Sequence, residues 1–162
     1  MKKIFHGSLV KVETPEIRTS NRTLDYGSGF YTTTSSEQAE AWVRRKMKEH
    51  QVGIGYVNEY LLDEDVVKEL HGLFFKEPSE EWLDFVMANR TEKDFTHSYD
   101  IVHGPVANDK VYAAFALYEG GILDKSTLIK ELKAYRLVDQ YLFHSPGSLR
   151  ALTFIQAKEI SI

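Results

Sequence analysis

The sequence of 162 residues contains no cysteine. Disulfide bonds, thiolate metal sites and a cysteine nucleophile are therefore excluded, and a reducing compartment is compatible with this composition. Proline is scarce, with four residues scattered singly, and no Pro/Gly-rich linker, internal repeat or low-complexity stretch indicates a domain boundary. The length suits one continuous core, so we predict a single domain over residues 1–162.

The sequence also lacks a long hydrophobic run and an excess of positive charge. Its first 17 residues have only short apolar stretches, interrupted by His6 and Lys11, which is typical of neither a signal peptide nor a membrane span. We therefore expect a cytoplasmic protein without a membrane partner. The net charge of −4 does not supply the general attraction that supports nucleic-acid binding. The basic cluster at residues 44–48 is more typical of a solvated helix face.

Three common functional motifs are missing. The sequence has no GxGxxG, no GxxxxGK[ST], and no HExxH or Cys/His metal spacing. The six histidines never fall four residues apart on a predicted helix. We therefore expect no metal ion in the site.

Strand and helix patterns are mixed irregularly along the chain. Aromatic, β-branched or alternating runs predict strands over residues 2–6, 30–34, 53–62, 99–103, 140–144 and 153–161. Helices are predicted from the Ser35 N-cap to about residue 50, over 78–89, over 110–118 and from Asp124 to about 135. Ser35 to Gln38 has the pattern of a capping box. Because no regular βαβ alternation exists, we predict an α+β fold.

Two short segments place glycine beside chemically useful side chains. The tripeptide at residues 6–8 puts an imidazole at a predicted strand end, before a glycine whose backbone can approach a ligand closely. Residues 25–33 place two glycines just before an aromatic strand. The structural alternative is that His6 is a satisfied structural residue, and that the second segment is a turn leading into a core strand.

These segments resemble the His-Tyr-Glu branch of the ADP-ribosyltransferases, which includes diphtheria toxin and the poly(ADP-ribose) polymerases. The resemblance rests on HGS at residues 6–8, GSGFYTT at 27–33, and a capped helix that bears a further aromatic residue. It implies split mixed or antiparallel sheets around an NAD cleft, with flanking helices. It also implies NAD as substrate and mono-ADP-ribosyl transfer to a protein or nucleic-acid acceptor.

The resemblance implies roles for individual residues. His6 would hydrogen-bond the adenosine ribose, and the backbone of Gly7, beside Ser8, would hold the nicotinamide amide. Tyr31, which follows Gly29, would stack on nicotinamide. Trp42, eleven residues later, would be the second stacking aromatic, although a core tryptophan on the buried face of the helix, together with Ala39, Val43 and Met47, explains it equally well.

The main departure from the family is Gln140, which stands where the family has its catalytic glutamate. A carboxylate both hydrogen-bonds the nicotinamide ribose and stabilises the oxocarbenium-like charge as nicotinamide leaves. Glutamine keeps the hydrogen bond and loses the charge, at a cost of about a hundredfold or more in rate. Asp139 cannot substitute, because neighbouring residues of a strand face opposite sides. Gln140 favours slow or single transfer, or binding without turnover.

Other positions complete the expected site. Ala39 falls where polymerase-like members often place a serine that contacts the carboxamide, a contact that Ser35 or Ser36 could take over. Two arginines, Arg18 and Arg22, are the cations best suited to the NAD pyrophosphate.

The motif at residues 99–109 is interpreted as a strand, a Gly-Pro turn and a helix cap. The functional alternative places its polar side chains at the acceptor or ribose side of the cleft, namely Asp100, Asn108 and Asp109.

A closer resemblance, spanning nearly the whole chain, is to an uncharacterised bacterial family with HGS, PxI, D-[FY]-GxGFYxT, YDIVxGP-[VI]-A-[ND]-D and QxxFH motifs. All five occur here, starting at residues 6, 15, 25, 99 and 140. That family itself resembles a divergent ADP-ribosyltransferase group, and some members sit beside small antitoxin-like partners. A toxin or phage-defence role follows from the resemblance. The alternatives are a weak or inactive NAD- or ADP-ribose-binding module, or a protein-interaction module.

Overall fold

The computed structural model describes residues 1–18, 25–92, 94–106, 109–135 and 137–162. Seven strands form one mixed sheet in the order β4-β5-β6-β2-β1-β3-β7. All neighbouring strands are antiparallel except β4 and β5, which run parallel. The strands are β1 (Lys2–Ser8), β2 (Phe30–Thr33), β3 (Ile54–Leu62), β4 (Gly72–Phe74), β5 (Ile101–Pro105), β6 (Asp139–Phe143) and β7 (Leu152–Ser161).

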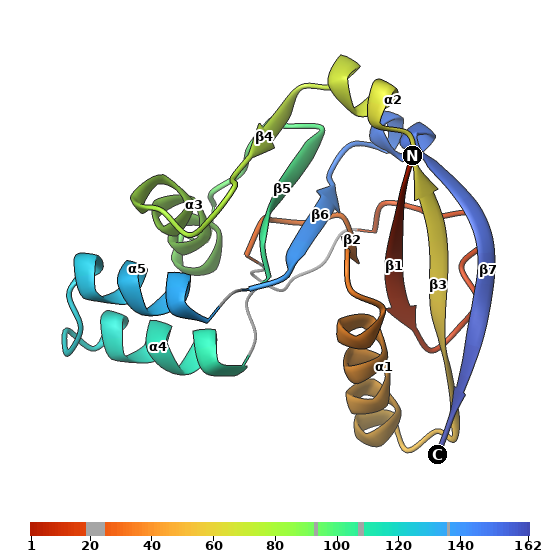
Figure 1. The fold of residues 1–162 in the computed structure, drawn as a ribbon, viewed down its shortest axis with the longest axis horizontal. Coiled ribbons are helices and arrows are strands. Elements are labelled where there is room, and N and C mark those ends of the chain that lie inside the picture. Colours follow the sequence, from red (N-terminus) through yellow and green to blue (C-terminus); the bar gives the residue numbers. More distant parts are fainter. Residues whose placement is uncertain (19–24, 93, 107–108, 136) are drawn as a thin grey trace.

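Helices lie in two groups beside this sheet. In Figure 1, α3, α4 and α5 gather beside the β4-β5-β6 part, whereas α1 lies alone beside β1, β3 and β7. In the described ranges no helix is long and apolar enough to cross a membrane. The helices are α1 (Ser36–His50), α2 (Glu64–Glu69), α3 (Glu80–Thr91), α4 (Asp109–Glu119), α5 (Lys125–Ala134) and the 3-10 helix η1 (Pro146–Ala151).

This architecture confirms the predicted α+β class and corrects several details. The predicted helices and strands are present, but α2 and β4 were not foreseen. The first strand continues through Gly7 to Ser8 instead of ending at residue 6. At the start of α1, Ser35 Oγ accepts from Gln38 N as expected, at 3.1 Å. The reciprocal half of the capping box is replaced, because Ser35 N donates to Thr33 Oγ1 at 3.1 Å.

The sheet is narrowest where β1 meets β2. Between these strands the described residues pair only at Phe5 and Thr33, whereas β1 pairs with β3 along its whole length, from Lys2 to Ser8. The expected pair of separate sheets is therefore corrected to one sheet with a narrow join. One half contains β4, β5, β6 and β2, and the other contains β1, β3 and β7.

Alternation along the strands gives the sheet two distinct faces. Residues directly opposite each other on neighbouring strands share a face, and consecutive residues of a strand point to opposite faces. One face, here called the helix face, packs against α1 and α3–α5 and carries Phe5, Val57, Val102 and Leu142. The opposite face packs against α2 and η1 and carries the buried residues Ile4, Phe30, Tyr60, Ile101, Tyr141 and Phe143.

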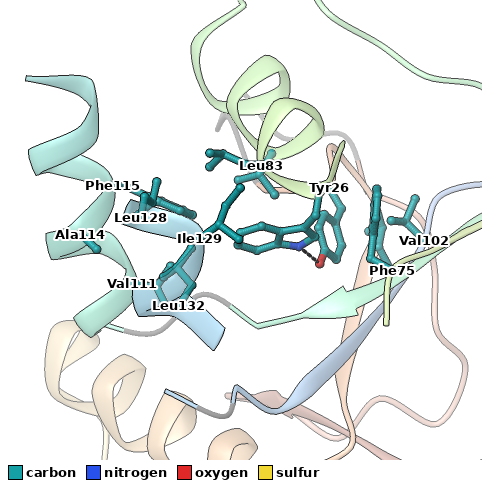
Figure 2. Packing of buried hydrophobic residues seen from close by; sticks show 13 residues of the cluster. Tyr26, Phe75, Leu83, Val102, Val111, Ala114, Phe115, Leu128, Ile129 and Leu132 are labelled. Atoms are coloured by element: carbon teal, nitrogen blue, oxygen red, sulfur yellow. Dashed lines mark hydrogen bonds between the residues drawn. The ribbon is translucent and has the colours of Figure 1, made fainter. Parts of the chain in front are cut away.

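A buried tyrosine connects the helices to the sheet on the helix face. The Tyr26 hydroxyl accepts a hydrogen bond from Trp82 Nε1 at 2.8 Å and donates one to the Pro105 carbonyl at 2.9 Å. Figure 2 shows the indole and phenol rings meeting within the apolar cluster. Both side chains are fully buried. Because a Cβ at position 104 would lie 2.4 Å from the Tyr26 hydroxyl, Gly104 leaves the room that this contact needs.

We expect Tyr26→Phe to destabilise the fold by about 1–3 kcal/mol, because the buried indole N–H of Trp82 would lose its acceptor. The matched control is Tyr135→Phe, which removes a hydroxyl bonded to Glu131 at 2.7 Å in a more exposed place and should cost less than about 1 kcal/mol. Urea unfolding of both variants measures the difference. Equal losses would contradict the role given to Tyr26.

Candidate functional site

Residues 26–31 are here called the glycine segment. Four of its backbone carbonyls accept hydrogen bonds, one from the Tyr31 side chain within the segment and three from histidines elsewhere in the chain. The Tyr31 hydroxyl donates to the Gly27 carbonyl at 2.5 Å. A carbonyl oxygen only accepts, so each imidazole nitrogen that bonds one carries a hydrogen. Three such bonds are present: His97 Nε2 to Tyr26 O at 2.8 Å, His144 Nδ1 to Ser28 O at 2.7 Å, and His6 Nδ1 to Tyr31 O at 2.6 Å.

The two glycines of this segment have conformations that side chains disfavour. Gly27 has φ +86°, and Gly29 has φ +147°. A Cβ at Gly29 would lie 2.3 Å from the Phe143 carbonyl oxygen, which means that the segment lies directly against β6. Gly29 was predicted to bind NAD, and its place in the structure is this close approach to β6.

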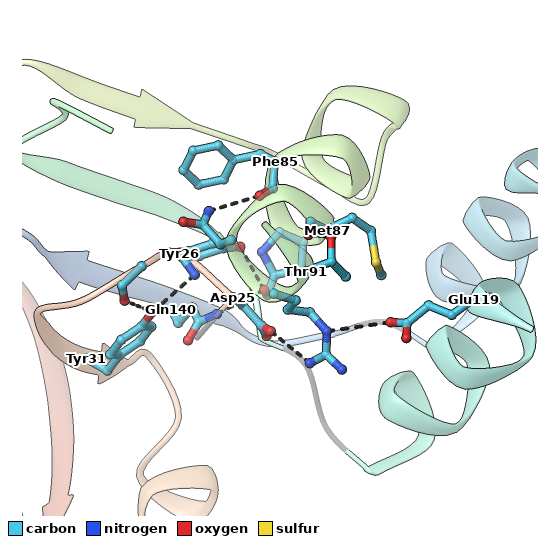
Figure 3. A network of polar contacts seen from close by, with 12 residues as sticks. Asp25, Tyr26, Tyr31, Phe85, Met87, Thr91, Glu119 and Gln140 are labelled. Atoms are coloured by element: carbon cyan, nitrogen blue, oxygen red, sulfur yellow. Dashed lines mark hydrogen bonds and ion pairs between the residues drawn. The ribbon is translucent and has the colours of Figure 1, made fainter. Parts of the chain in front are cut away.

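Tyr31 lies on β2 with its ring half-buried and its hydroxyl fully engaged. Besides donating to Gly27, that oxygen accepts from Tyr26 N at 3.1 Å (Figure 3). Burial raises the pKa of Tyr31 well above its ordinary value. The hydroxyl therefore fixes the orientation of the ring and is unsuited to proton transfer, while the aromatic face is the part that can serve a ligand.

Trp42 lies beside Gly7 and is not a core residue. Its side chain is 41% exposed, which corrects the alternative that placed it on the buried face of α1 with Ala39 and Val43. Lys46 Nζ lies 5.2 Å from the centre of its ring. A Cβ on Gly7 would lie 2.7 Å from the Ala39 carbonyl oxygen and 3.4 Å from Trp42 Cε3. Gly7 thus lets α1 approach β1 and brings an exposed indole against the strand.

Gln140 belongs to the same face of the sheet as Gly7 and Tyr31. On β6 it lies opposite Thr33 of β2, and Thr33 lies opposite Phe5 of β1 across the narrow join. Because every second residue of a strand points to the same face, Tyr31 on β2 and Gly7 on β1 share that face. The side chain is 9% exposed. Its Nε2 donates to the Pro105 carbonyl at 3.4 Å, and Figure 3 shows it within the network around Tyr26. A donor at this position suits a carbonyl neighbour, and a carboxylate would not.

His6 points to the opposite face of the sheet. Its ring lies against Phe30, with ring centres 4.2 Å apart, and burial lowers its pKa. Because Nδ1 is used by the Tyr31 carbonyl, Nε2 is the atom that a ligand would contact. Ser8, at the end of β1, accepts from Val10 N at 3.2 Å, which gives it a turn-stabilising role.

The remaining predicted residues differ in how far the structure describes them. Arg18 is exposed, and Arg22 and Asn108 lie outside the described residues. Asp109 is the first residue of α4, and its side chain also lies outside the described part. Asp100 supports the structural interpretation of its motif, because its carboxylate accepts from His71 N at 2.9 Å.

Sequence reasoning missed an ion pair beside the glycine segment. Arg90 Nη1 lies 3.3 Å from Asp25 Oδ1, and Arg90 Nε lies 3.9 Å from Glu119 Oε1 (Figure 3). The guanidinium also lies over the ring of Phe115, 5.2 Å from its centre. Burial raises the pKa of Asp25, and Arg90 opposes that shift. No local signal links two residues that are 65 positions apart.

A separate hollow lies on the other flank of α1. Trp42 and Glu40 are two residues apart and therefore point about 200° apart around the helix. The hollow borders Glu40 and, apart from Ser36, a candidate for the carboxamide contact, it contains none of the residues assigned to NAD. The hollow is lined by Phe5, Ser36, Glu40, Val57, Glu59, Gln156 and Lys158.

No group of His, Cys, Asp or Glu side chains suited to a metal ion is found within the described ranges.

Residues 2–154 match the model of a protein family described as "Protein of unknown function (DUF3990)". The chain belongs to the DUF3990 family. No curated protein and no solved structure matches the chain. The DUF3990 match includes all the residues assigned to NAD or to the acceptor, and its description assigns no activity. The function of this DUF3990 protein is therefore argued from the geometry of the site.

We expect Gln140→Glu to destabilise the protein in a pH-dependent way. Burial beside the Pro105 carbonyl will raise the pKa of the new carboxyl above its unfolded value of about 4.3. The variant should therefore match the wild type below about pH 4.3 and lose stability as the pH rises above it, by about 1–3 kcal/mol at neutral pH. Chemical unfolding at several pH values measures this loss.

The matched control for that variant is Gln38→Glu. Position 38 lies in the first turn of α1, where a negative charge favours the helix dipole. This variant should keep or slightly gain stability at neutral pH. A Gln140→Glu protein that is as stable as Gln38→Glu at pH 7 would refute the buried contact with Pro105.

Proposed function

We propose that this protein binds NAD where β1 and β2 diverge, and that it is an ADP-ribosyltransferase-like protein whose turnover is limited by Gln140. The observation that carries the proposal is the exposed Trp42 against Gly7, on the sheet face that also bears Tyr31 and Gln140. These are the positions that the family resemblance assigns to nicotinamide and its ribose.

An exposed tryptophan beside a glycine is well suited to a flat ligand. A large aromatic side chain that stays in water forgoes much of the hydrophobic stabilisation that burial would give it. The half-exposed indole of Trp42 is therefore a candidate for stacking on a ligand. Gly7 contributes backbone without a side chain, so an amide can approach it closely. Nicotinamide combines a flat ring with an amide group. We place it between the rings of Trp42 and Tyr31, next to Gly7.

The rest of NAD would extend across the narrow join. His6 lies on the opposite face from Gln140, so a ligand that contacts both must cross the sheet where β1 and β2 no longer pair. Beyond the single pair at Phe5 and Thr33 the described residues of the two strands are not paired, and this is where we propose that the ligand crosses. In this arrangement His6 Nε2 contacts the adenosine ribose, as in the resembled family, and an arginine before the glycine segment contacts the pyrophosphate.

Gln140 supports slow chemistry or none. Its amide is buried and donates to Pro105, and it carries no charge to stabilise an oxocarbenium-like transition state. This contact favours the second candidate function, an NAD- or ADP-ribose-binding module without turnover. A protein or nucleic-acid acceptor, and a toxin or phage-defence role with an antitoxin-like partner, extend the proposal through the family resemblance.

Calorimetry with NAD tests the binding step. We expect saturable binding, and an affinity about tenfold weaker in Trp42→Ala, because one stacking ring contributes about 0.5–1.5 kcal/mol beyond its buried area. Phe74→Ala is the matched control: Phe74 is 50% exposed on β4, at the far edge of the sheet, and its loss should leave the affinity unchanged. No heat from NAD or ADP-ribose with the wild type would refute the proposal.

Labelled NAD distinguishes the two candidate functions. With the label in the ADP-ribose part, slow release of nicotinamide together with transfer of labelled ADP-ribose to water or to an acceptor supports the transferase. Calorimetric binding without nicotinamide release supports the binding module and rejects the enzyme.

A further inference from the structure

The middle of the glycine segment, residues 27–29, offers few side chains by which it could be held, whereas Tyr26 and Phe30 on either side of it are buried in the core. Gly27 and Gly29 have none, and their positive φ angles give the backbone unusual freedom. Its carbonyl groups are therefore the points of attachment. We propose that His97 and His144 are positioning residues for the NAD site, because they fix the glycine segment and thereby the ring of Tyr31. This inference rests on the proposed function.

His97 is bound at both ring nitrogens. Nε2 donates to the Tyr26 carbonyl at 2.8 Å, and Nδ1 accepts from Tyr99 N at 3.2 Å. These two bonds together require the neutral imidazole with its hydrogen on Nε2. A second proton on Nδ1 would face the Tyr99 N–H and break that bond. Protonation would leave the Nε2–H donor to Tyr26 in place but break the Tyr99 contact that fixes the ring, so the two bonds exist together only in the neutral form.

His144 links the same segment to the centre of the sheet. It follows β6, and its backbone N donates to the Asp100 carbonyl at 2.8 Å, at the start of β5. Its Nδ1 donates to the Ser28 carbonyl. The rings of His97 and His144 lie against each other, with centres 4.2 Å apart. The two histidines thus act as neighbouring contacts on successive parts of one segment.

The position of Tyr31 depends on these contacts. Its hydroxyl bonds the Gly27 carbonyl and the Tyr26 amide, both of which belong to the segment that His97 and His144 hold. If either histidine bond is lost, the atoms that orient the Tyr31 hydroxyl can shift. Trp42 lies on α1, outside this segment. We therefore expect a weaker nicotinamide contact with Trp42 still in place.

Several titratable groups surround His97. His144 faces it directly, and burial together with that neighbour lowers the pKa of His97. The His71 ring stacks on Tyr99, with ring centres 4.9 Å apart, and the His71 backbone N donates to the Asp100 carboxylate. The Asp25–Arg90 pair adjoins Tyr26. Because the folded pKa of His97 is lowered, its contacts are intact at neutral pH. The Tyr99 contact is lost as the pH falls through this lowered pKa, which lies below the ordinary histidine value of about 6.5.

Substituting each histidine by an amide residue keeps a hydrogen-bond donor and removes the imidazole ring, so the two contributions can be measured apart. The glutamine Nε2 approximates the donor of His97, and the asparagine Nδ2 approximates that of His144. We expect His97→Gln and His144→Asn to bind NAD within about threefold of the wild type. His97→Leu and His144→Leu lack a donor and should bind about tenfold more weakly. His50→Leu, at the exposed end of α1, is the control and should have no effect.

The pH dependence of NAD affinity tests the positioning role, because a purely structural role of His97 would not change it. NAD affinity of the wild type should be highest above about pH 6.5 and fall as the pH is lowered below that value, and the fall should be smaller in His97→Gln, because an amide does not titrate. His6 also titrates and is retained, so a residual fall is expected. Wild-type affinity in both leucine variants, or the full wild-type fall in His97→Gln, would overturn the inference.

Hydrogen exchange of the free protein makes the test independent of NAD. The amides of residues 27–29 should exchange faster in His97→Leu and His144→Leu than in the wild type, and those of β3 should not change. If the wild type binds no NAD, the proposed function fails while exchange still tests the positioning. Unchanged exchange at residues 27–29 in both leucine variants overturns the inference by itself.

Discussion

The site depends on the hydrogen bonds that hold the backbone carbonyls of residues 26–31. Two glycines free this segment from steric restriction, and three imidazoles and the Tyr31 hydroxyl restrict it again. The segment leads directly into β2, the strand of its half of the sheet that pairs with β1 in the other half. Its conformation therefore determines where Tyr31 lies and how β2 reaches β1.

A second constraint explains the glutamine at position 140. The Pro105 carbonyl accepts from the Tyr26 hydroxyl and from the Gln140 amide, and Tyr26 in turn supports Trp82 in the core. A neutral donor satisfies this buried group, whereas a carboxylate would face a carbonyl in an apolar setting. Stability of the core and the charge that the proposed transferase chemistry would use thus make opposite demands on one residue. The structure has the side chain that satisfies the core.

Local patterns predicted most of the fold, because strands and capped helices are encoded over a few residues. The Ser35 cap and the last strand are examples. The misses are short or non-local: α2 and β4 are only six and three residues long, and Trp42 lies at the edge of the apolar stripe of α1, where periodicity does not separate a core position from an exposed one. The contact between His144 and Ser28 spans 116 positions, and no sequence period reports it. The site residues came from the family resemblance, and their arrangement on two faces of the sheet came from strand register.

The most direct test of NAD binding beside Trp42 uses the two tryptophans of the chain. Each gives one indole N–H signal in a ¹⁵N-correlated NMR spectrum. Trp42 is exposed beside Gly7, whereas Trp82 is fully buried and bonded to Tyr26. On titration with NAD, the Trp42 signal should shift to saturation while the Trp82 signal stays in place. Two unmoved signals, or a shift of Trp82 alone, would contradict the account.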